Sequence, residues 1–230
     1  MVKKRDTAEA RERLSRDAIV TGAIALADAE GLGAVTIRRL AQAHGVTPMA
    51  LYWHFKDKDQ LLDAIAERLF SEVQFPPADS APWDDQLRAL LMALVAALRP
   101  HPAVAGLARA SVLSCEPGLA VAEHTLSLLR QAGFDADKSA EIGGFLLTAV
   151  VTLVSDEPGL AYGADAEARE DAMRVKRASL SALSPRRHPN VVASAEALAA
   201  CTGPEANHEL GIDMLVTGIV CMAEGRVTSR

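Results

Sequence analysis

The stretch TIRRLAQAHGVTPMALYWHF, residues 36–55, decides the fold. Thr36 can cap a short helix, and Gly45 can end it. Thr47 and Pro48 then stand as a cap residue and a first helical residue, because proline lacks an N–H that the first turn leaves unbonded anyway. The second helix is expected to end near Phe55. Two short helices joined by a tight turn predict a helix-turn-helix, whose second helix fits the major groove of DNA.

The apolar residues of this stretch are spaced to hold its two helices together, and we expect inward packing of Leu40, Ala41, Val46 and Leu51. An ordinary helical hairpin is the alternative for a generic pattern of apolar residues around a glycine. That alternative does not explain Tyr52, Trp53 and His54. Three consecutive side chains on a short helix cannot all face inward, so at least one ring must face outward.

Helices are also predicted on both sides of this stretch. Ser15 can cap a helix over residues 15–30 that Gly31 ends, and Asp57 can cap another that runs to about residue 73. The connection QFPPADSAP, residues 74–82, marks the seam to the second half of the chain. Beyond it, we expect helices over residues 83–99, 102–111, 117–132, 135–155, 164–183, 191–200 and 205–224, with loops over 156–165 and 184–190.

The composition favours an all-α fold. Aromatic residues make up only 4% of the 230-residue chain, alanine and leucine are abundant, and we expect almost no strand. The net charge is −6, yet the first 60 residues hold ten Lys and Arg against eight Asp and Glu. Residues 1–14 are predicted to be a basic flexible arm that lies along DNA phosphates, with a frayed solvated tail as the alternative.

Several classes of protein are disfavoured. The three cysteines have no metal-ligand spacing, so reduced thiols are expected and neither a metal nor a cofactor is. No catalytic residues are proposed, because the chain has no G-x-S-x-G, H-E-x-x-H or P-loop motif, and we expect no enzyme. The start has no apolar signal core, and the apolar run over residues 142–154 is shorter than the roughly 20 residues of a membrane span. We therefore expect a cytoplasmic protein with no membrane partner.

The sequence resembles the TetR (tetracycline-repressor) family of transcriptional regulators. The matching residues are Thr36, Leu40, Ala41, Gly45, Val46, Leu51, Tyr52, Trp53, His54, Phe55, Lys56, Lys58, Leu61 and Leu62. The rest of the chain is similar to the effector-binding half of the tetracycline-repressor subgroup, for example at Trp83 and at residues 130–134. The resemblance implies a DNA-binding domain over residues 15–73 and an effector-binding and dimerisation domain over 74–230.

The resemblance also implies which side chains touch DNA. Arg38 would meet a base edge or a phosphate, and Lys58 a phosphate. Pro48, Met49 and Ala50 offer few hydrogen bonds, so thymine methyl groups suit them. The full predicted set is Thr36, Arg38, Thr47, Pro48, Met49, Ala50, Tyr52, Trp53, His54 and Lys58. Packing at the surface is the alternative role for each of them.

A homodimer is expected because one short recognition helix touches too few base pairs, whereas two of them about 34 Å apart read two half-sites. The helices over residues 135–155 and 205–224 are apolar nearly all round. The resemblance implies that they form a four-helix interface between two subunits. Burial in the core of a monomer is the alternative.

The helices over residues 83–132 are expected to enclose a largely apolar effector pocket, with a filled core as the alternative. The predicted ligand-binding residues are Leu87, Leu90, Leu94, His101, Leu107, Thr125 and Leu128. Where tetracycline-binding relatives carry polar side chains, this chain has Gln74, Leu90, Leu94, Ala108 and Thr125. Magnesium-chelated tetracycline is therefore not expected as the ligand.

The function that follows from the resemblance is a repressor that binds a double-stranded DNA operator and is released by a small, largely apolar effector. The family also includes activators. The alternative from another class is a helical small-molecule-binding protein without DNA-binding activity.

Overall fold

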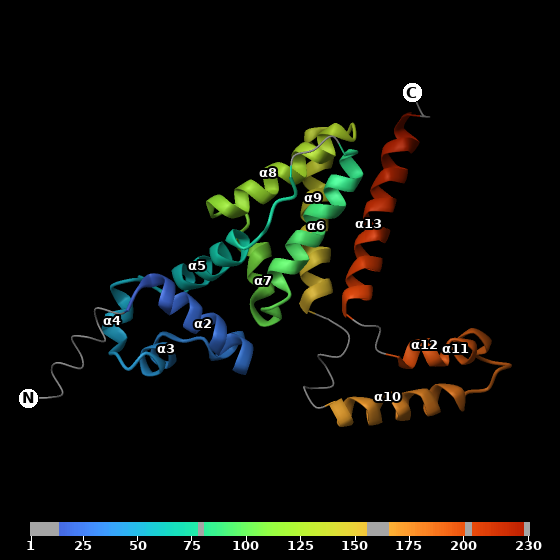
Figure 1. The fold of residues 1–230 in the computed structure, drawn as a ribbon, viewed down its shortest axis with the longest axis horizontal. Coiled ribbons are helices and arrows are strands. Elements are labelled where there is room, and N and C mark those ends of the chain that lie inside the picture. Colours follow the sequence, from blue (N-terminus) through green and yellow to red (C-terminus); the bar gives the residue numbers. More distant parts are fainter. Residues whose placement is uncertain (1–13, 78–80, 156–165, 201–203, 228–230) are drawn as a thin grey trace, which may run out of the picture.

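The computed structural model describes residues 14–77, 81–155, 166–200 and 204–227. Within these residues every regular element is a helix, which confirms the predicted all-α fold. The N-terminal helices, meaning α2 to α5, form one end of the molecule (Figure 1). They are α2 (Arg16–Glu30), the short 3-10 helix η1 (Leu32–Ala34), α3 (Ile37–Ala43), α4 (Pro48–Tyr52) and α5 (Lys58–Ser71).

The predicted caps of these helices are present. The side chains of Ser15, Thr36 and Asp57 accept hydrogen bonds from the backbone N–H three residues later, at 3.0, 3.2 and 2.8 Å. Each bond satisfies a backbone donor that the first helical turn leaves free. Gly31 ends α2 at φ 84°, a value that glycine adopts without strain.

α4 is shorter than predicted, since it ends at Tyr52 and not near Phe55. The N–H groups of His54 and Phe55 both donate to the carbonyl oxygen of Leu51, so Trp53 and His54 lie in a turn. The Phe55 side chain is fully buried, and this burial draws the chain inward toward α5. Of the predicted arm over residues 1–14, only Leu14 belongs to the described residues, and it is buried.

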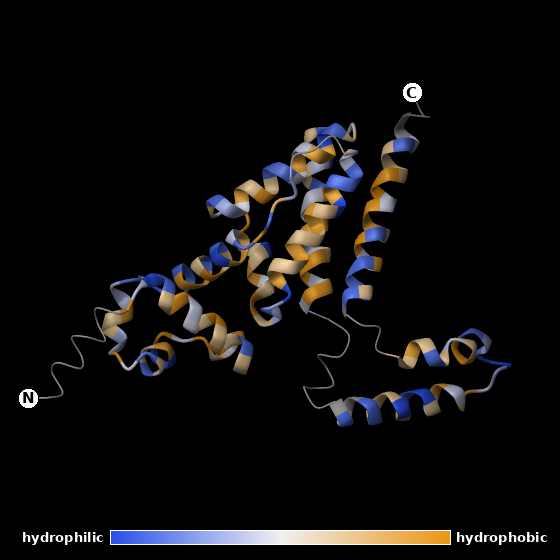
Figure 2. Cartoon of the chain, in the orientation of Figure 1, coloured by the Kyte–Doolittle hydropathy of each residue, from blue (hydrophilic) through white to orange (hydrophobic). Residues whose placement is uncertain are grey.

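The body of the molecule is built around α9 (Ala136–Ser155). α6 (Trp83–Leu98), α7 (Pro102–Ser111), α8 (Glu116–Gln131) and α13 (Pro204–Val227) all pack against it. By length and composition alone α9 could cross a membrane. Its buried face of Ile142, Leu146, Val150 and Val154 lies in the core, so in this fold it is a core helix. Residues of high hydropathy are frequent along α6 and α9 (Figure 2).

The C-terminal end of α9 is fixed to α13. The ring Nε2 of His208, which is only 1% exposed, lies 3.2 Å from the carbonyl oxygen of Leu153. That oxygen belongs to the last turn of α9, where backbone acceptors have no partner within the helix. A Cβ added at Gly211 would lie 2.9 Å from the Leu153 side chain, so the two helices approach closely here.

Three further helices, α10 (Ala166–Ser181), α11 (Pro189–Ala193) and α12 (Ala195–Ala199), stand clear of the body (Figure 1). α10 packs against α12, and Arg177 pairs with Glu196 at 3.1 Å. The prediction of one helix over residues 191–200 is wrong, because two short helices meet at Ser194. Serine is unfavourable in the interior of a helix, because its side chain competes for backbone hydrogen bonds. The predicted loop over 156–165 lies outside the described residues.

Candidate nucleic-acid interface and apolar cavity

The turn between α3 and α4 has the geometry that the sequence predicted. Gly45 has a φ of 65°, and the N–H of Val46 donates to the carbonyl oxygen of Ala41 at 2.9 Å. Leu40, Ala41 and Leu51 are buried at the junction of the two helices. α3 and α4 therefore form a helix-turn-helix unit, and α3 packs against α2.

Gly22 and His44 set how closely the turn approaches α2. A Cβ added at Gly22 would lie 2.6 Å from the Nε2 atom of His44. Any side chain at residue 22 would therefore require the imidazole of His44 to move. Sequence reasoning missed this contact, although a glycine in the interior of a helix is a signal of close approach.

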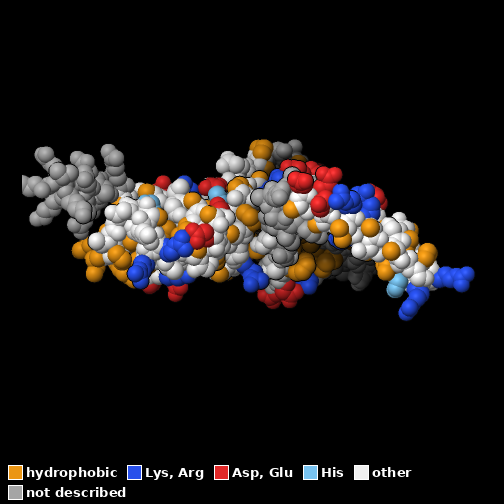
Figure 3. Space-filling view, turned by 90° about the horizontal axis from the view of Figure 1, so that it is seen from below, with side chains coloured by type: hydrophobic (Ala, Val, Ile, Leu, Met, Phe, Trp, Pro, Cys, Tyr) orange, Lys and Arg blue, Asp and Glu red, His pale blue; other side chains and the backbone are white. Residues whose placement is uncertain are grey.

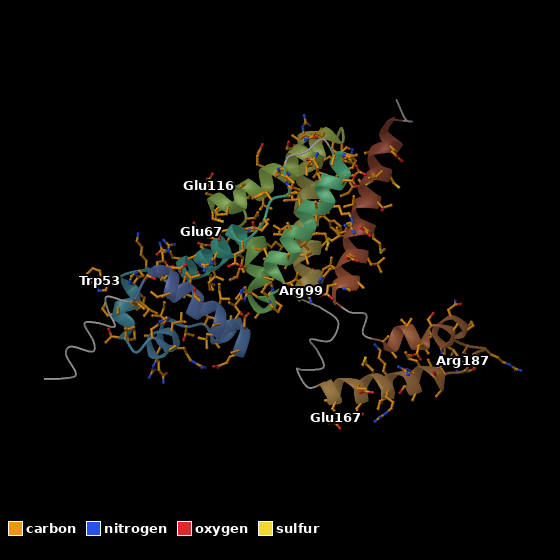
Figure 4. The ribbon with its side chains drawn as sticks, viewed as in Figure 1. Trp53, Glu67, Arg99, Glu116, Glu167 and Arg187 are labelled. Atoms are coloured by element: carbon orange, nitrogen blue, oxygen red, sulfur yellow. The ribbon has the colours of Figure 1, made fainter. Side chains whose placement is uncertain are left out.

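The helix-turn-helix leaves several large side chains in solvent. Met49 is 67% exposed, Tyr52 49% and Trp53 76%, and Trp53 projects from the outer end of the molecule (Figure 4). Hydrophobic side chains gather at this end in the space-filling view, at the left (Figure 3). Of the other predicted DNA-binding residues, Ala50 and His54 are half-buried, and the exposed ones are Thr36, Arg38, Thr47, Pro48 and Lys58. Eight of the ten predicted residues are thus exposed on or beside α3, α4 and the start of α5, and we call the predicted set the reading surface.

The basic residues of α3 have different surroundings. Arg39 is bound to Glu30 of α2 at 2.5 Å, whereas Arg38 is exposed and has no ion pair within the described part of the chain. Below the unit, Arg68 of α5 donates to Asp17 of α2 and to Glu72, and these hydrogen bonds raise the pKa of Arg68. Arg39 and Arg68 hold helices together, and Arg38 is left available for a phosphate or a base.

An apolar cavity of about 190 Å³ lies in the body between α6, α8, α9 and the two residues that follow α7, and the exposed Leu113, Ala140 and Gly144 stand at its open side. Thr125 is the polar residue among those that line it, and its hydroxyl already donates to the Val121 carbonyl oxygen at 2.8 Å. The cavity therefore offers its occupant an almost purely apolar wall. The lining residues are Leu91, Leu94, Val112, Leu113, Val121, Ala122, Thr125, Leu126, Ala140, Gly143, Gly144 and Leu147.

Two predicted ligand-binding residues, Leu94 and Thr125, line this cavity, and the others do not. Leu87, Leu90 and Leu128 are at most 1% exposed and belong to the packed core. Leu107 is half-buried, and His101 lies against Asp28 of α2. The wall that α9 supplies was not predicted from the sequence. The pair Gly143 and Gly144 in an apolar helix is the signal for it, since glycines leave space where side chains would fill it.

A second hollow of about 430 Å³ runs along the outer face of α9 and α13. Phe145 is 63% exposed and Met214 68%, and both line this hollow, which we call the α9/α13 groove. Its other lining residues are Lys138, Glu141, Ile142, Leu146, Leu215, Gly218, Ile219 and Met222. Large apolar side chains left together in solvent mark an interaction surface.

Metal-ligating clusters are not found among the described residues: no three His, Cys, Asp or Glu side chains gather closely enough to hold an ion. Cys115 is half-buried at the start of α8, and the loss of solvent around it raises the pKa of its thiol. A raised pKa lowers the fraction of reactive thiolate at neutral pH.

Comparisons with known proteins agree with this arrangement. The profile described as bacterial regulatory proteins, tetR family, matches residues 19–65, and the tetracyclin repressor-like C-terminal domain matches residues 75–223. An HTH-type transcriptional regulator of Saccharopolyspora erythraea is 30% identical over 74% of this chain and 74% of its own length. The class C tetracycline repressor of Escherichia coli is 30% identical over 90% of this chain and 91% of its own length.

Solved structures show the same fold. The TetR family protein ActR of Streptomyces coelicolor, in complex with actinorhodin, has a TM-score of 0.75 and 27% identity. The match covers 91% of this chain and 98% of ActR. The ActR complex with (S)-DNPA has a TM-score of 0.74 and 26% identity, with 90% of this chain and 98% of ActR covered.

A helix-turn-helix carried by a helical body with an apolar cavity defines a class of protein: transcriptional regulators that bind DNA at one end and a small ligand in the body. The chain belongs to the TetR family of bacterial regulatory proteins, with a C-terminal domain of the tetracycline-repressor type. The resemblance seen in the sequence is thereby confirmed, over both halves of the chain.

Proposed function

We propose that this protein is a cytoplasmic, homodimeric repressor that binds an operator through the reading surface and is released by a small apolar effector. The observation that carries the proposal is the presence, in one chain, of an exposed reading surface and a cavity in the body. DNA contact would come from residues 15–73, with the arm over 1–14, and ligand and partner contact from 74–230. Named repressors among the relatives support the direction of control.

The effector site would be the cavity between α6 and α9, with Leu94 and Thr125 among its contacts. Its lining suits an apolar or amphipathic molecule, and ActR, a similar protein, has been solved with (S)-DNPA and with actinorhodin. Sites for drug-sized ligands usually measure about 300 to 1,000 Å³. Because this cavity is smaller, at about 190 Å³, such a ligand would have to move its walls apart.

The α9/α13 groove supports the proposed homodimer. Its large apolar side chains lie on the two helices that the sequence marked as apolar nearly all round. A two-fold axis through this face would bring α9 and α13 of each subunit into a four-helix interface. The two reading surfaces would then stand on one side of the dimer, as a palindromic operator requires.

Selection of DNA fragments tests the proposal. The purified full-length protein is incubated with a pool of random duplexes, and bound fragments are recovered, sequenced and assayed again by fluorescence anisotropy. We expect a palindromic site, and candidate apolar ligands are then tested for release of the protein from that site. Failure to enrich any sequence, with ligand binding retained, would favour a small-molecule-binding protein without DNA-binding activity.

Arg38 carries the first prediction for the reading surface. If its guanidinium reads a base, Arg38→Ala weakens binding to the selected operator by about 1 to 3 kcal/mol and relaxes the preference at one position of each half-site. The check is a repeat of the selection with the variant. An unchanged base preference would show that Arg38 does not read a base.

Lys58 carries the second prediction. It is the first residue of α5, where the positive end of the helix dipole disfavours a cation, so a partner outside the helix explains it better than helix stability. If Lys58 binds a phosphate, Lys58→Ala flattens the dependence of log K on log salt concentration by roughly 0.9 per phosphate contact. The exposed Lys176 of α10 provides the control, since Lys176→Ala should keep the wild-type slope. Equal slopes for wild type and Lys58→Ala would contradict the contact.

A further inference from the structure

A polar contact joins the end of α2 to the start of α7. The Nδ1 atom of His101 lies 2.7 Å from Oδ2 of Asp28, although the two residues are 73 positions apart. Both side chains are largely shielded, with 26% and 30% of their surfaces exposed. α2 carries the helix-turn-helix and α7 belongs to the body, so this contact connects the two functional parts of the chain.

Stability of α2 does not explain the carboxylate. Asp28 lies in the last turn of α2, which ends at Glu30, and the negative end of a helix dipole disfavours an anion there. Glu30 has the same disadvantage, but its partner Arg39 lies within the N-terminal helices. The partner of Asp28 lies in the body. The position of Asp28 is therefore best explained by its contact with His101.

α7 reaches from this contact to the cavity. His101 precedes its first residue, and Val112 and Leu113, directly after its last residue, line the cavity. Ten helical residues span about 15 Å, and the buried Val104, Ala105 and Ala108 pack this length into the core. At the far end the hydroxyl of Ser111 donates to Asp63 of α5 at 2.9 Å. A carboxylate of the N-terminal helices thus holds α7 near each of its ends.

We propose that the contact between His101 and Asp28 positions the DNA-binding helices, and that occupancy of the cavity acts on this contact through α7. The inference rests on the proposed function, because it takes the cavity to be the effector site. A ligand wider than the cavity pushes the half-buried Val112 outward, and a packed helix responds by moving as a unit. The movement draws His101 away from Asp28, so α2 and the reading surface lose the orientation that fits the operator.

The experiment uses cavity-filling variants in place of an unidentified effector. Ala122→Leu on α8 and Gly143→Val on α9 each place a larger side chain in the cavity, since a Cβ at Gly143 would lie 3.6 Å from the lining side chain of Leu126. Each is combined with Asp28→Ala, and binding to the selected operator is measured by anisotropy on the full-length dimer. Typical coupling between sites corresponds to about 5- to 150-fold in affinity. We expect each filling variant to weaken binding about 10-fold in the wild-type background and less than about 3-fold when Asp28 is already replaced.

Two matched variants separate positioning from stability. Glu30→Ala removes a carboxylate from the same turn of α2 but leaves the contact with α7, so the filling variants should keep their full effect in that background. Asp28→Glu retains a carboxylate, so in that background the filling variants should weaken operator binding as much as they do in the wild type. Thermal unfolding identifies any variant that fails to fold, and two filling positions are used for that reason.

The outcomes distinguish the inference from the proposed function. An effect of the filling variants that is equally large with Asp28→Ala would overturn the role of the His101 contact while leaving the cavity as the control site. If neither filling variant changed operator binding, the proposal that occupancy of the cavity releases the protein from DNA would be overturned. The inference about His101 and Asp28 would be overturned with it.

Discussion

Replacing Phe145 and Met214 together with glutamate is expected to produce a monomer whose affinity for the operator falls by about 1,000-fold or more. Both side chains are more than 60% exposed on the α9/α13 groove. In the proposed homodimer each charge would be buried in the interface between the two subunits, and a buried unpaired charge costs several kcal/mol. A monomer presents one recognition helix and reads one half-site, which leaves little more than nonspecific affinity.

Analytical ultracentrifugation and anisotropy on the same samples check this prediction. Leu119→Glu is the matched control, because Leu119 is an apolar residue of α8 that is 44% exposed and lies outside the groove. It should leave both the oligomeric state and operator binding unchanged. A double variant that is monomeric yet binds the operator as tightly as the wild type would contradict the two-site arrangement.

Gly118→Ala is expected to lower the free energy of unfolding by about 2 to 3 kcal/mol, a large effect for the addition of one methyl group. A Cβ at this position of α8 would lie 2.3 Å from the carbonyl oxygen of Val112, and backbone cannot rotate out of the way as a side chain can. The turn between α7 and α8 would have to open. Because Val112 also lines the cavity, the cavity would change shape as well.

Gly106→Ala is the control for Gly118→Ala. Gly106 lies on the exposed side of α7, and a Cβ there would meet nothing within 4 Å. Alanine should therefore stabilise the helix by about 0.5 to 1 kcal/mol. Thermal unfolding at one fixed protein concentration measures both variants, since a dimer unfolds at a temperature that depends on concentration. Equal melting temperatures for the two variants would show that the contact at Gly118 is not tight.

Local sequence signals predicted the DNA-binding half of the fold well. Ser15, Thr36 and Asp57 cap their helices as expected, because capping depends on a side chain and a backbone group only three residues apart. The helix-turn-helix follows from spacing within 20 residues. The early end of α4 was not predicted, since it depends on the burial of Phe55 by helices elsewhere in the chain.

The cavity was harder to predict, because leucines that fill a core and leucines that line a hollow are alike in sequence. Leu90 is packed in the core, whereas Leu91, its neighbour in the chain, faces the cavity. Which of the two does so depends on the rotation of α6 against α9. His101 illustrates the same limit: a histidine near the predicted pocket is bound instead to a residue 73 positions away.

The close joint between His208, Gly211 and the end of α9 holds one of the helices that line the cavity against α13. α9 is held against α13, and in the proposed dimer both helices also pack against the same helices of the partner subunit. That side of the cavity should therefore resist movement. A ligand that widens the cavity should then displace Val112 and α7 instead of α9. In the proposed mechanism α7 therefore moves relative to the DNA-binding helices, and the interface between the subunits stays in place.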